Sequence, residues 1–242
     1  MKALQSVLAA VDFSEPSAHA VAVAGFIAQV CHARLTLLHA EAVEAPVYFT
    51  AEQLDHLERE RRVNRAAVEA SVARFGHEHT PSGFAVVLHD EPPAAAVVHA
   101  SASADLVVMG THGRQGPARW WLGSVAERAV HDIWKPLLIV RSEVTPLDTL
   151  FARILVYGDS RSSGGQAVEH ARSFAAQCGG TVFDERGVAI EEALDRTHAT
   201  IVIAATPNPR TALWMWRYVE RIVHSCTVPL LFVPELTQGE AS

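Results

Sequence analysis

Cysteine is scarce in this sequence, which has neither a long apolar run nor a surplus of positive charge. The three cysteines, Cys31, Cys178 and Cys226, are odd in number and far apart. This spacing excludes a disulfide scaffold and leaves no CxxC motif for a metal or a redox reaction. We therefore expect buried thiols, since free cysteine is among the residues most often found in protein cores.

The absence of a long apolar run excludes a membrane-spanning helix, which requires roughly 18 consecutive apolar residues. Met1 to Gln5 lead straight into a strand-like segment instead of a signal-peptide core. The 20 basic and 27 acidic residues give a formal net charge of -7, which opposes a polyanionic partner. We therefore expect a cytoplasmic protein that binds neither nucleic acid nor membrane.

The composition is that of a globular protein, with 49% hydrophobic and 19% charged residues over 242 positions. This length allows one large α/β domain or two small ones, and an internal repeat favours two. The apolar segment that ends at Asp12 has a counterpart that ends at Asp159, 147 positions later. The apolar segment Leu137–Val140 has a counterpart at Leu230–Val233.

The repeat predicts two lobes of unequal length. We expect a first lobe over residues 1–141, a linker over 142–152, a second lobe over 153–234 and a polar tail over 235–242. Runs rich in Val, Leu and Ile alternate with helical segments, which predicts an α/β fold of two doubly wound parallel-sheet lobes. The second lobe lacks a counterpart of the long charged helix Ala51–Phe75 and of one strand, so we expect a truncated copy.

The last strand of each lobe is short and apolar, and an uncovered strand of this kind invites pairing. If Leu137–Val140 pairs with Leu230–Val233, the chain forms an intrachain pseudo-dimer. The sequence leaves open whether two such chains also associate as a homodimer.

One loop of the first lobe has the spacing of a phosphate site. Gly110, Gly113, Gly123 and Ser124 follow the pattern G-x2-G-x9-G-S between a strand and a helix. Glycines let main-chain N–H groups approach an anion, and the start of the next helix adds its positive dipole end. The loop also contains Arg114 and no acidic residue, so its charge favours a polyphosphate.

Two residues of this region have a purely structural alternative. Ser124 and Glu127 form the S-x-x-E pattern of a capping box, so Ser124 could serve only as a helix cap. Asp12 ends the first strand, where it would flank a crevice with Gly110 and could bond a ribose hydroxyl or an adenine amine. Asp12 could instead cap the helix that begins near Ser14, or form an Asx turn there.

With these motifs, the first lobe resembles the universal stress protein family, in its ATP-binding branch. The glycine spacing is that branch's nucleotide motif, and V-D-F-S (11–14), G-T-H-G-R (110–114) and G-S-V-A-E-R (123–128) also resemble the family's sequence. The whole chain resembles a tandem member of the family, with an adenine nucleotide alpha hydrolase-like fold. The resemblance covers residues 1–141 well and 153–234 weakly.

The resemblance implies that the ligand is ATP or ADP, with Mg²⁺ held through the phosphates. At the adenine and ribose end it implies contacts from Ala10, Asp12 and Ala40. Along the ribose and the phosphates it implies contacts from Met109, Gly110, Gly113, Gly123, Ser124, Val125 and Ala126. The second lobe departs from the motif, because Asn208, Trp216 and Arg217 replace its second glycine, third glycine and serine. We expect that lobe to be degenerate and to act as a partner surface.

Other residues give weaker signals. His77 and His79 could bind a metal, but we expect them in a polar turn with no third ligand nearby, so no metal site is predicted. His112 lies inside the glycine loop and could contact phosphate or sense pH.

The leading hypothesis is a nucleotide-dependent regulatory protein of the stress response with one ATP site. An unknown downstream protein would recognise its nucleotide-bound state. An enzyme that slowly hydrolyses ATP or transfers its phosphate is an alternative, although the loop offers few of the groups that phosphoryl transfer needs. We therefore assign no catalytic residue. A nucleotide-free interaction scaffold is the third hypothesis.

Overall fold

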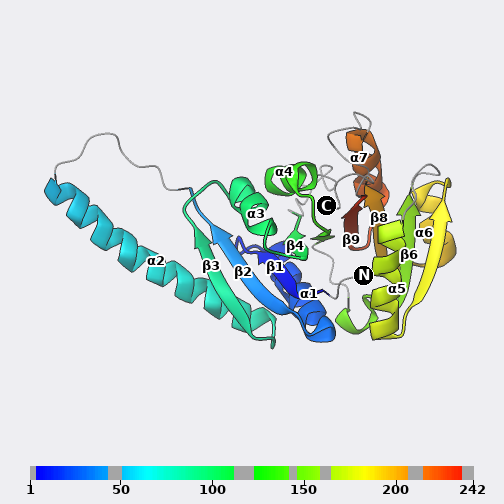
Figure 1. The fold of residues 1–242 in the computed structure, drawn as a ribbon, viewed down its shortest axis with the longest axis horizontal. Helices are drawn as coiled ribbons and strands as arrows, with labels where there is room; N and C mark the ends of the chain where they lie inside the picture. The colour runs from blue at the N-terminus through cyan, green and yellow to red at the C-terminus, as the bar shows by residue number, and fades with distance from the viewer. Residues whose placement is uncertain are drawn as a thin grey trace, which may run out of the picture.

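The computed structural model describes residues 4–42, 51–111, 123–141, 146–158, 165–206 and 215–235. For residues 51–61, 186 and 215–216 it describes the backbone alone. Strands and helices alternate along the chain, and all nine described strands belong to one sheet in the order β3-β2-β1-β4-β5-β9-β8-β6-β7 (Figure 1).

The first half of the sheet is built by residues up to Val140. Its strands are β1 (Ser6–Ala10), β2 (Arg34–Ala40), β3 (Phe84–His89), β4 (Leu106–Gly110) and β5 (Leu137–Val140). Its helices are α1 (Glu15–Cys31), α2 (Ala51–His79), α3 (Pro93–Ser101) and α4 (Ser124–Asp132). The strands of this half are mutually parallel, as their apolar runs predict.

The second half follows a short 3-10 turn, η1 (Leu147–Thr149). Its strands are β6 (Arg153–Gly158), β7 (Thr181–Arg186), β8 (Ile201–Thr206) and β9 (Leu230–Pro234), again mutually parallel. Its helices are α5 (Gly165–Cys178), α6 (Ile190–Thr197) and α7 (Met215–Ser225). The order β7-β6-β8-β9 repeats the order β2-β1-β4-β5, and β7 leads to α6 without a counterpart of α2 or β3. The predicted truncation of the second lobe is therefore confirmed.

The two halves join through an antiparallel pair of β5 and β9. Leu137 lies opposite Phe232, Leu138 opposite Leu231 and Ile139 opposite Leu230. Every residue of both strands is buried, so each strand covers the apolar edge of the other. This pairing confirms the expectation for the two closing strands, and it joins the strands of the two lobes into one continuous sheet.

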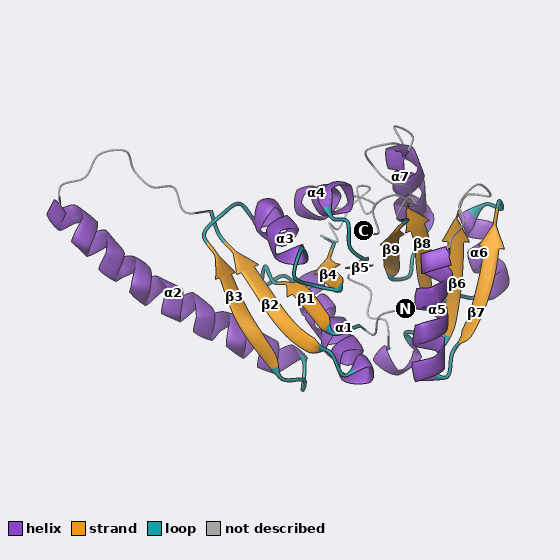
Figure 2. Ribbon diagram, viewed as in Figure 1, coloured by secondary structure: helices purple, strands orange, loops and turns teal. Residues whose placement is uncertain are grey.

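Helices cover both faces of the sheet, and each face has its own core (Figure 2). One core contains residues of α1, α2 and α5, and the other contains residues of α3, α4, α6 and α7. On the first face, the buried ring of Phe151 lies between Phe26 of α1 and Phe174 of α5, with centroid distances of 6.4 and 4.3 Å. These stacked rings bind the two halves together beneath the β5–β9 pair.

Helix α2 is longer than its sequence pattern predicts. It continues past Phe75 to His79, so His77 and His79 lie in its last turn, and the prediction of a polar turn there was wrong. The Nδ1 atom of His79 lies 2.7 Å from the carbonyl oxygen of Phe75, and the His77 ring lies 4.9 Å from the ring of Phe84. Local contacts of this kind hold both imidazoles against the helix and the neighbouring strand.

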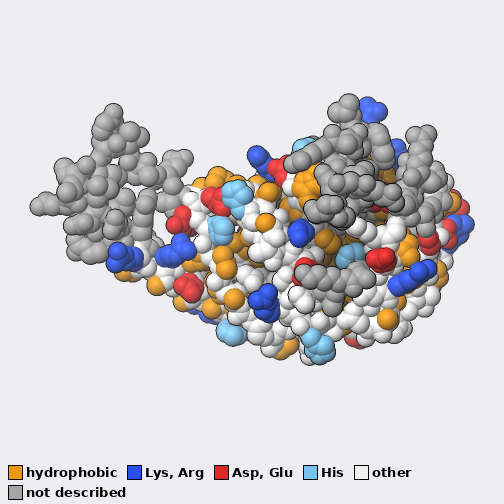
Figure 3. Space-filling model, in the orientation of Figure 1, with side chains coloured by type: hydrophobic (Ala, Val, Ile, Leu, Met, Phe, Trp, Pro, Cys, Tyr) orange, Lys and Arg blue, Asp and Glu red, His pale blue; other side chains and the backbone are white. Residues whose placement is uncertain are grey.

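The surface has mixed character. On the face that Figure 3 shows, basic and acidic side chains are interspersed among hydrophobic and polar ones. Within the ranges described above, no helix has both the length and the apolar character that a bilayer crossing demands.

Candidate functional site

A pocket opens at the carboxyl ends of β1, β2 and β4. Strands β1 and β4 are neighbours, yet α1 leaves β1 toward one face of the sheet and α4 follows β4 on the other face. This change of direction is the switch point at which open α/β sheets bind ligands. The pocket encloses about 640 Å³ of space outside the protein atoms, its open mouth included.

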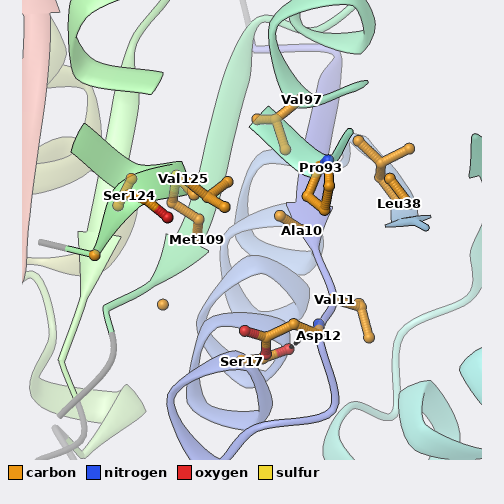
Figure 4. A pocket seen from close by; sticks show the side chains of 14 residues that line it. Ala10, Val11, Asp12, Ser17, Leu38, Pro93, Val97, Met109, Ser124 and Val125 are labelled. Carbon is orange, nitrogen blue, oxygen red and sulfur yellow. Dashed lines mark hydrogen bonds between the residues drawn. The ribbon is translucent and has the colours of Figure 1, made fainter. Parts of the chain in front are cut away.

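The structure brings most of the predicted site residues together around this pocket. Nine of the eleven line it: Ala10, Asp12, Ala40, Met109, Gly110, Gly123, Ser124, Val125 and Ala126. Gly113 and Arg114 lie outside the described residues, as does His112. Figure 4 shows Ser124 and Val125 of α4 and Val97 of α3 around the same space.

Five further residues line the pocket without having been predicted: Val11, Ser17, Leu38, Pro93 and Val97. Leu38 could have been found, because it lies beside Ala10 in the parallel register of β1 and β2. Pro93 and Val97 belong to α3, which crosses the sheet from β3 to β4. The sequence gives no local signal for that crossing.

Asp12 forms the Asx turn considered for it and also lies at the pocket. Its Oδ1 atom accepts hydrogen bonds from the Ser14 main-chain N–H at 3.0 Å and from the Ser14 hydroxyl at 2.5 Å, which is an Asx turn. Ser14 in turn caps α1 by accepting from the Ser17 N–H. The exposed Asp12 side chain also lines the pocket, so the turn holds the carboxylate at the pocket's edge.

The capping box predicted for α4 is absent. Gly123 is the N-cap residue, with φ 75° and ψ 151°, and among the described residues no side chain makes a capping hydrogen bond at this end. Glu127 donates its main-chain N–H to the Gly123 carbonyl at 2.9 Å, and Ser124 is the first helical residue. A residue with a Cβ would be strained at such a φ, so glycine is required here by the backbone. The uncapped end of α4 faces the pocket, where its dipole favours an anion.

Gly110 has a packing reason of its own. A Cβ atom at this position would lie 2.5 Å from the carbonyl carbon and oxygen of Pro16, in the first turn of α1. Only glycine lets the end of β4 approach α1 this closely. The approach draws the ends of β4 and α1 together on one side of the pocket.

The corresponding place in the second half is filled. Tyr157 occupies the position of Ala10 at the 147-residue offset, and Tyr218 occupies that of Val125 in the matching helices. The two rings stack with centroids 6.4 Å apart and an angle of 9°. Tyr157 is 7% exposed, and its hydroxyl donates to the Val188 carbonyl at 3.0 Å.

Closure of the second lobe was predicted from other residues. Asn208 and the side chain of Trp216 lie outside the described residues, while Arg217 is exposed on α7. The described side chains that fill the space are the two tyrosines, which were not predicted from the sequence.

A polar cluster supports the α3 side of the pocket. Glu91 lies two residues after the end of β3, and its carboxylate oxygens lie 2.6 and 2.8 Å from the Nδ1 atoms of His89 and His99. The hydrogen bond from His89 is the main cause of a lowered pKa of the Glu91 carboxyl, and His99 adds to it. The cluster ties the end of β3 to α3, the helix that carries Pro93 and Val97.

The three thiols lie away from the pocket lining. Cys226 is fully buried, as expected, and burial raises its pKa to about 11. Cys31 and Cys178 are half-buried, and burial, with a smaller effect of Cys178, raises the pKa of Cys31 to about 11. Among the residues with described side chains, no three His, Cys, Asp or Glu residues gather closely enough to hold a metal ion.

Comparison with known proteins places these features in context. The model described as Universal stress protein family matches residues 3–141. A relative from Thermus aquaticus, "Universal stress protein in QAH/OAS sulfhydrylase 3'region", is 32% identical over 139 residues, which is 57% of this chain and 98% of that protein.

Two solved structures share the fold over nearly the whole chain. A universal stress protein from Archaeoglobus fulgidus superposes with a TM-score of 0.68 at 17% identity, covering 97% of this chain and 99% of its own. A functionally unknown protein from Pseudomonas aeruginosa PAO1 gives a TM-score of 0.64 at 13% identity, with coverage of 96% and 93%. At these identities the likeness concerns the fold alone.

Proposed function

Because the chain belongs to the universal stress protein family through residues 3–141, we propose that it is a nucleotide-dependent regulatory protein of the stress response. Its first lobe binds one ATP or ADP at the carboxyl ends of β1 and β4. The observation that carries this proposal is the convergence of nine predicted contact residues, from four separate segments, on one pocket.

The pocket's chemistry fits an adenine nucleotide. Small-molecule sites are concave and mostly apolar with a few placed polar groups, and the lining of this pocket has that character, with Asp12, Ser17 and Ser124 among apolar residues. Ala10, Leu38 and Val97 form an apolar wall that suits a base, and the Asp12 carboxylate can accept a hydrogen bond from a ribose hydroxyl. The uncapped start of α4 suits the phosphates.

Magnesium would bind through the nucleotide. Asp12 is the one carboxylate among the described residues that line the pocket, and Mg²⁺ sites commonly combine one or two carboxylates with substrate phosphates. Bound ATP would therefore supply most of the ligands.

The lining favours binding over turnover. Phosphoryl transfer requires a positioned nucleophile, charge-stabilising groups and a base or water-positioning residue. The described lining offers Asp12, already engaged in its Asx turn, and the hydroxyls of Ser17 and Ser124. We propose that the bound state is read by a downstream protein.

Isothermal titration calorimetry of the full chain with ADP and ATP tests the proposal. We expect one site per chain. Ser124→Asp should abolish binding because it places a carboxylate beside the phosphates, while an acidic first turn keeps α4 stable. Ser124→Asn is the matched neutral control and should retain binding. Two equivalent sites, or an affinity that Ser124→Asp leaves intact, would contradict the assignment.

A further inference from the structure

A second hollow lies beside the pocket, between α2 and the ends of β1 and β2. It encloses about 1020 Å³, its wide mouth included, and shares Ala40 with the pocket. Its described lining is Phe13, His39, Ala40, Glu41, Asn64, Ala67, Val68 and Ser71. We call this hollow the Phe13 subsite.

Phe13 is the unusual residue of the hollow. Its φ is 60°, a left-handed conformation that is a genuine outlier for a bulky side chain. The other described non-glycine residues with positive φ, His32 and His198, are the C-cap residues of α1 and α6, where this conformation is usual. The Asx turn between Asp12 and Ser14 imposes the conformation on Phe13 but does not require a phenyl ring.

Backbone strain disfavours a phenylalanine at this position, and burial compensates for that strain only in part. Glycine or asparagine would adopt the same φ at lower cost, and the Phe13 side chain is 43% exposed instead of buried. Strained residues of this kind concentrate at ligand sites.

Neighbouring rings hold the phenyl group in place. The His39 ring lies 4.9 Å from it at 51°, and the Phe75 ring meets it edge-on at 5.5 Å and 83°. The Nδ1 atom of His39 lies 2.7 Å from the Val11 carbonyl oxygen, which fixes the imidazole. Phe13 is therefore a positioned aromatic surface, next to polar groups of Asn64 and Ser71 that line the same hollow.

We propose that the Phe13 subsite binds a planar aromatic group joined to the nucleoside end of the nucleotide in the main pocket. This inference rests on the proposed function, in which Ala40 lies at the nucleoside end. The aromatic group stacks on Phe13, and the Asn64 amide, both donor and acceptor, pairs with polar atoms on the group's edge. The ligand class is a nucleotide that carries a second base or a similar ring.

The test compares two ligands on the full chain by calorimetry and by fluorescence anisotropy: ADP, and ADP esterified on its ribose with N-methylanthranilate. We expect the ester to bind about tenfold more tightly, a typical effect of one aromatic stack. Phe13→Asn should reduce that ratio to about one and leave ADP binding intact, and relief of the backbone strain should offset part of the stability lost with the ring contacts to His39 and Phe75. Phe13→Tyr should keep the ratio.

Val63→Ser is the control for nonspecific attraction, because Val63 is an exposed apolar residue of α2 outside the lining of the hollow. It should leave the ratio unchanged. If ADP binds but the ester binds no more tightly, the Phe13 subsite is refuted and the proposed function stands. The same conclusion follows if the ester still binds more tightly than ADP in Phe13→Asn. If neither ligand binds, both proposals fail.

Discussion

Tyr157 stacks on Tyr218 in the second lobe at the positions where Ala10 and Val125 border the pocket of the first. The two halves share their strand order, so the difference arises from side chains and not from topology. Two small or medium residues leave a hollow, whereas two phenol rings fill it. The pair accounts for an expected stoichiometry of one ligand per chain.

Transfer of the tyrosine pair to the first lobe tests this relationship. We expect Ala10→Tyr combined with Val125→Tyr to abolish nucleotide binding, because the rings would occupy the space of the base. Calorimetry measures the binding, and circular dichroism checks that the protein stays folded. Ala10→Ser keeps a small side chain and should bind normally. An unchanged affinity in the double variant would show that the base lies elsewhere.

Removal of one tyrosine tests the second lobe. Tyr157→Ala should lower the free energy of unfolding by about 3 kcal/mol, because it leaves a cavity beneath Tyr218. Tyr157→Phe keeps the ring and loses only the hydrogen bond to Val188, so we expect a loss of about 1 kcal/mol. Urea unfolding measures both values. Equal losses would indicate that the hydroxyl, and not the ring, is what the second lobe requires.

Glu91 gives the protein a predictable response to acid. Its pKa is lower in the folded protein, mainly because His89 donates a hydrogen bond to it. A carboxyl with a lowered pKa stabilises the fold above its unfolded-state pKa, and that stabilisation disappears as the pH falls through the folded-state value. We therefore expect Glu91→Gln to lower the thermal midpoint at neutral pH but to match the wild type well below pH about 4. Calorimetric scans over a pH series check this, and a gap that persists in acid would contradict it.

The sequence predicted those features of the site that depend on local pattern. Gly110 ends β4 and Asp12 lies two residues after the end of β1, and parallel strands bring their carboxyl ends to one edge of the sheet. The strand ends therefore predicted the edge of the sheet that carries the pocket, whereas the family resemblance implied most of its lining, including Ala10, Ala40 and Met109. The pairing of Leu137–Val140 with another strand could also be predicted, since a short apolar edge strand needs a partner.

Features that depend on tertiary contacts were missed. Pro93 and Val97 reach the pocket because α3 crosses the sheet, which no local pattern encodes. Ser124 followed a capping pattern, but α4 begins one residue earlier than that pattern requires, with Gly123 as its cap and Ser124 as its first residue. Tyr157 and Tyr218 are far apart in sequence, so their stacking could not be read from either segment alone.

The β5–β9 pair explains what the second lobe contributes to the first. Leu138 of β5 lies opposite Leu231 of β9. The Arg141 guanidinium, just after β5, also donates to the Val223 carbonyl in the last turn of α7. A fragment of residues 1–141 would lose both contacts and expose the buried edge Leu137–Val140 to solvent.

We expect that fragment to keep its nucleotide pocket, whose described lining lies wholly within residues 10–126, but to self-associate through the exposed strand. Light scattering beside the full chain measures the association, and ADP titration of both measures the site. Ile139→Lys in the fragment is the matched variant, because a charge on an edge strand opposes pairing and should reduce the association. A monomeric fragment with the full chain's affinity would show that β9 is not needed to cover β5, and the second lobe would then require another explanation.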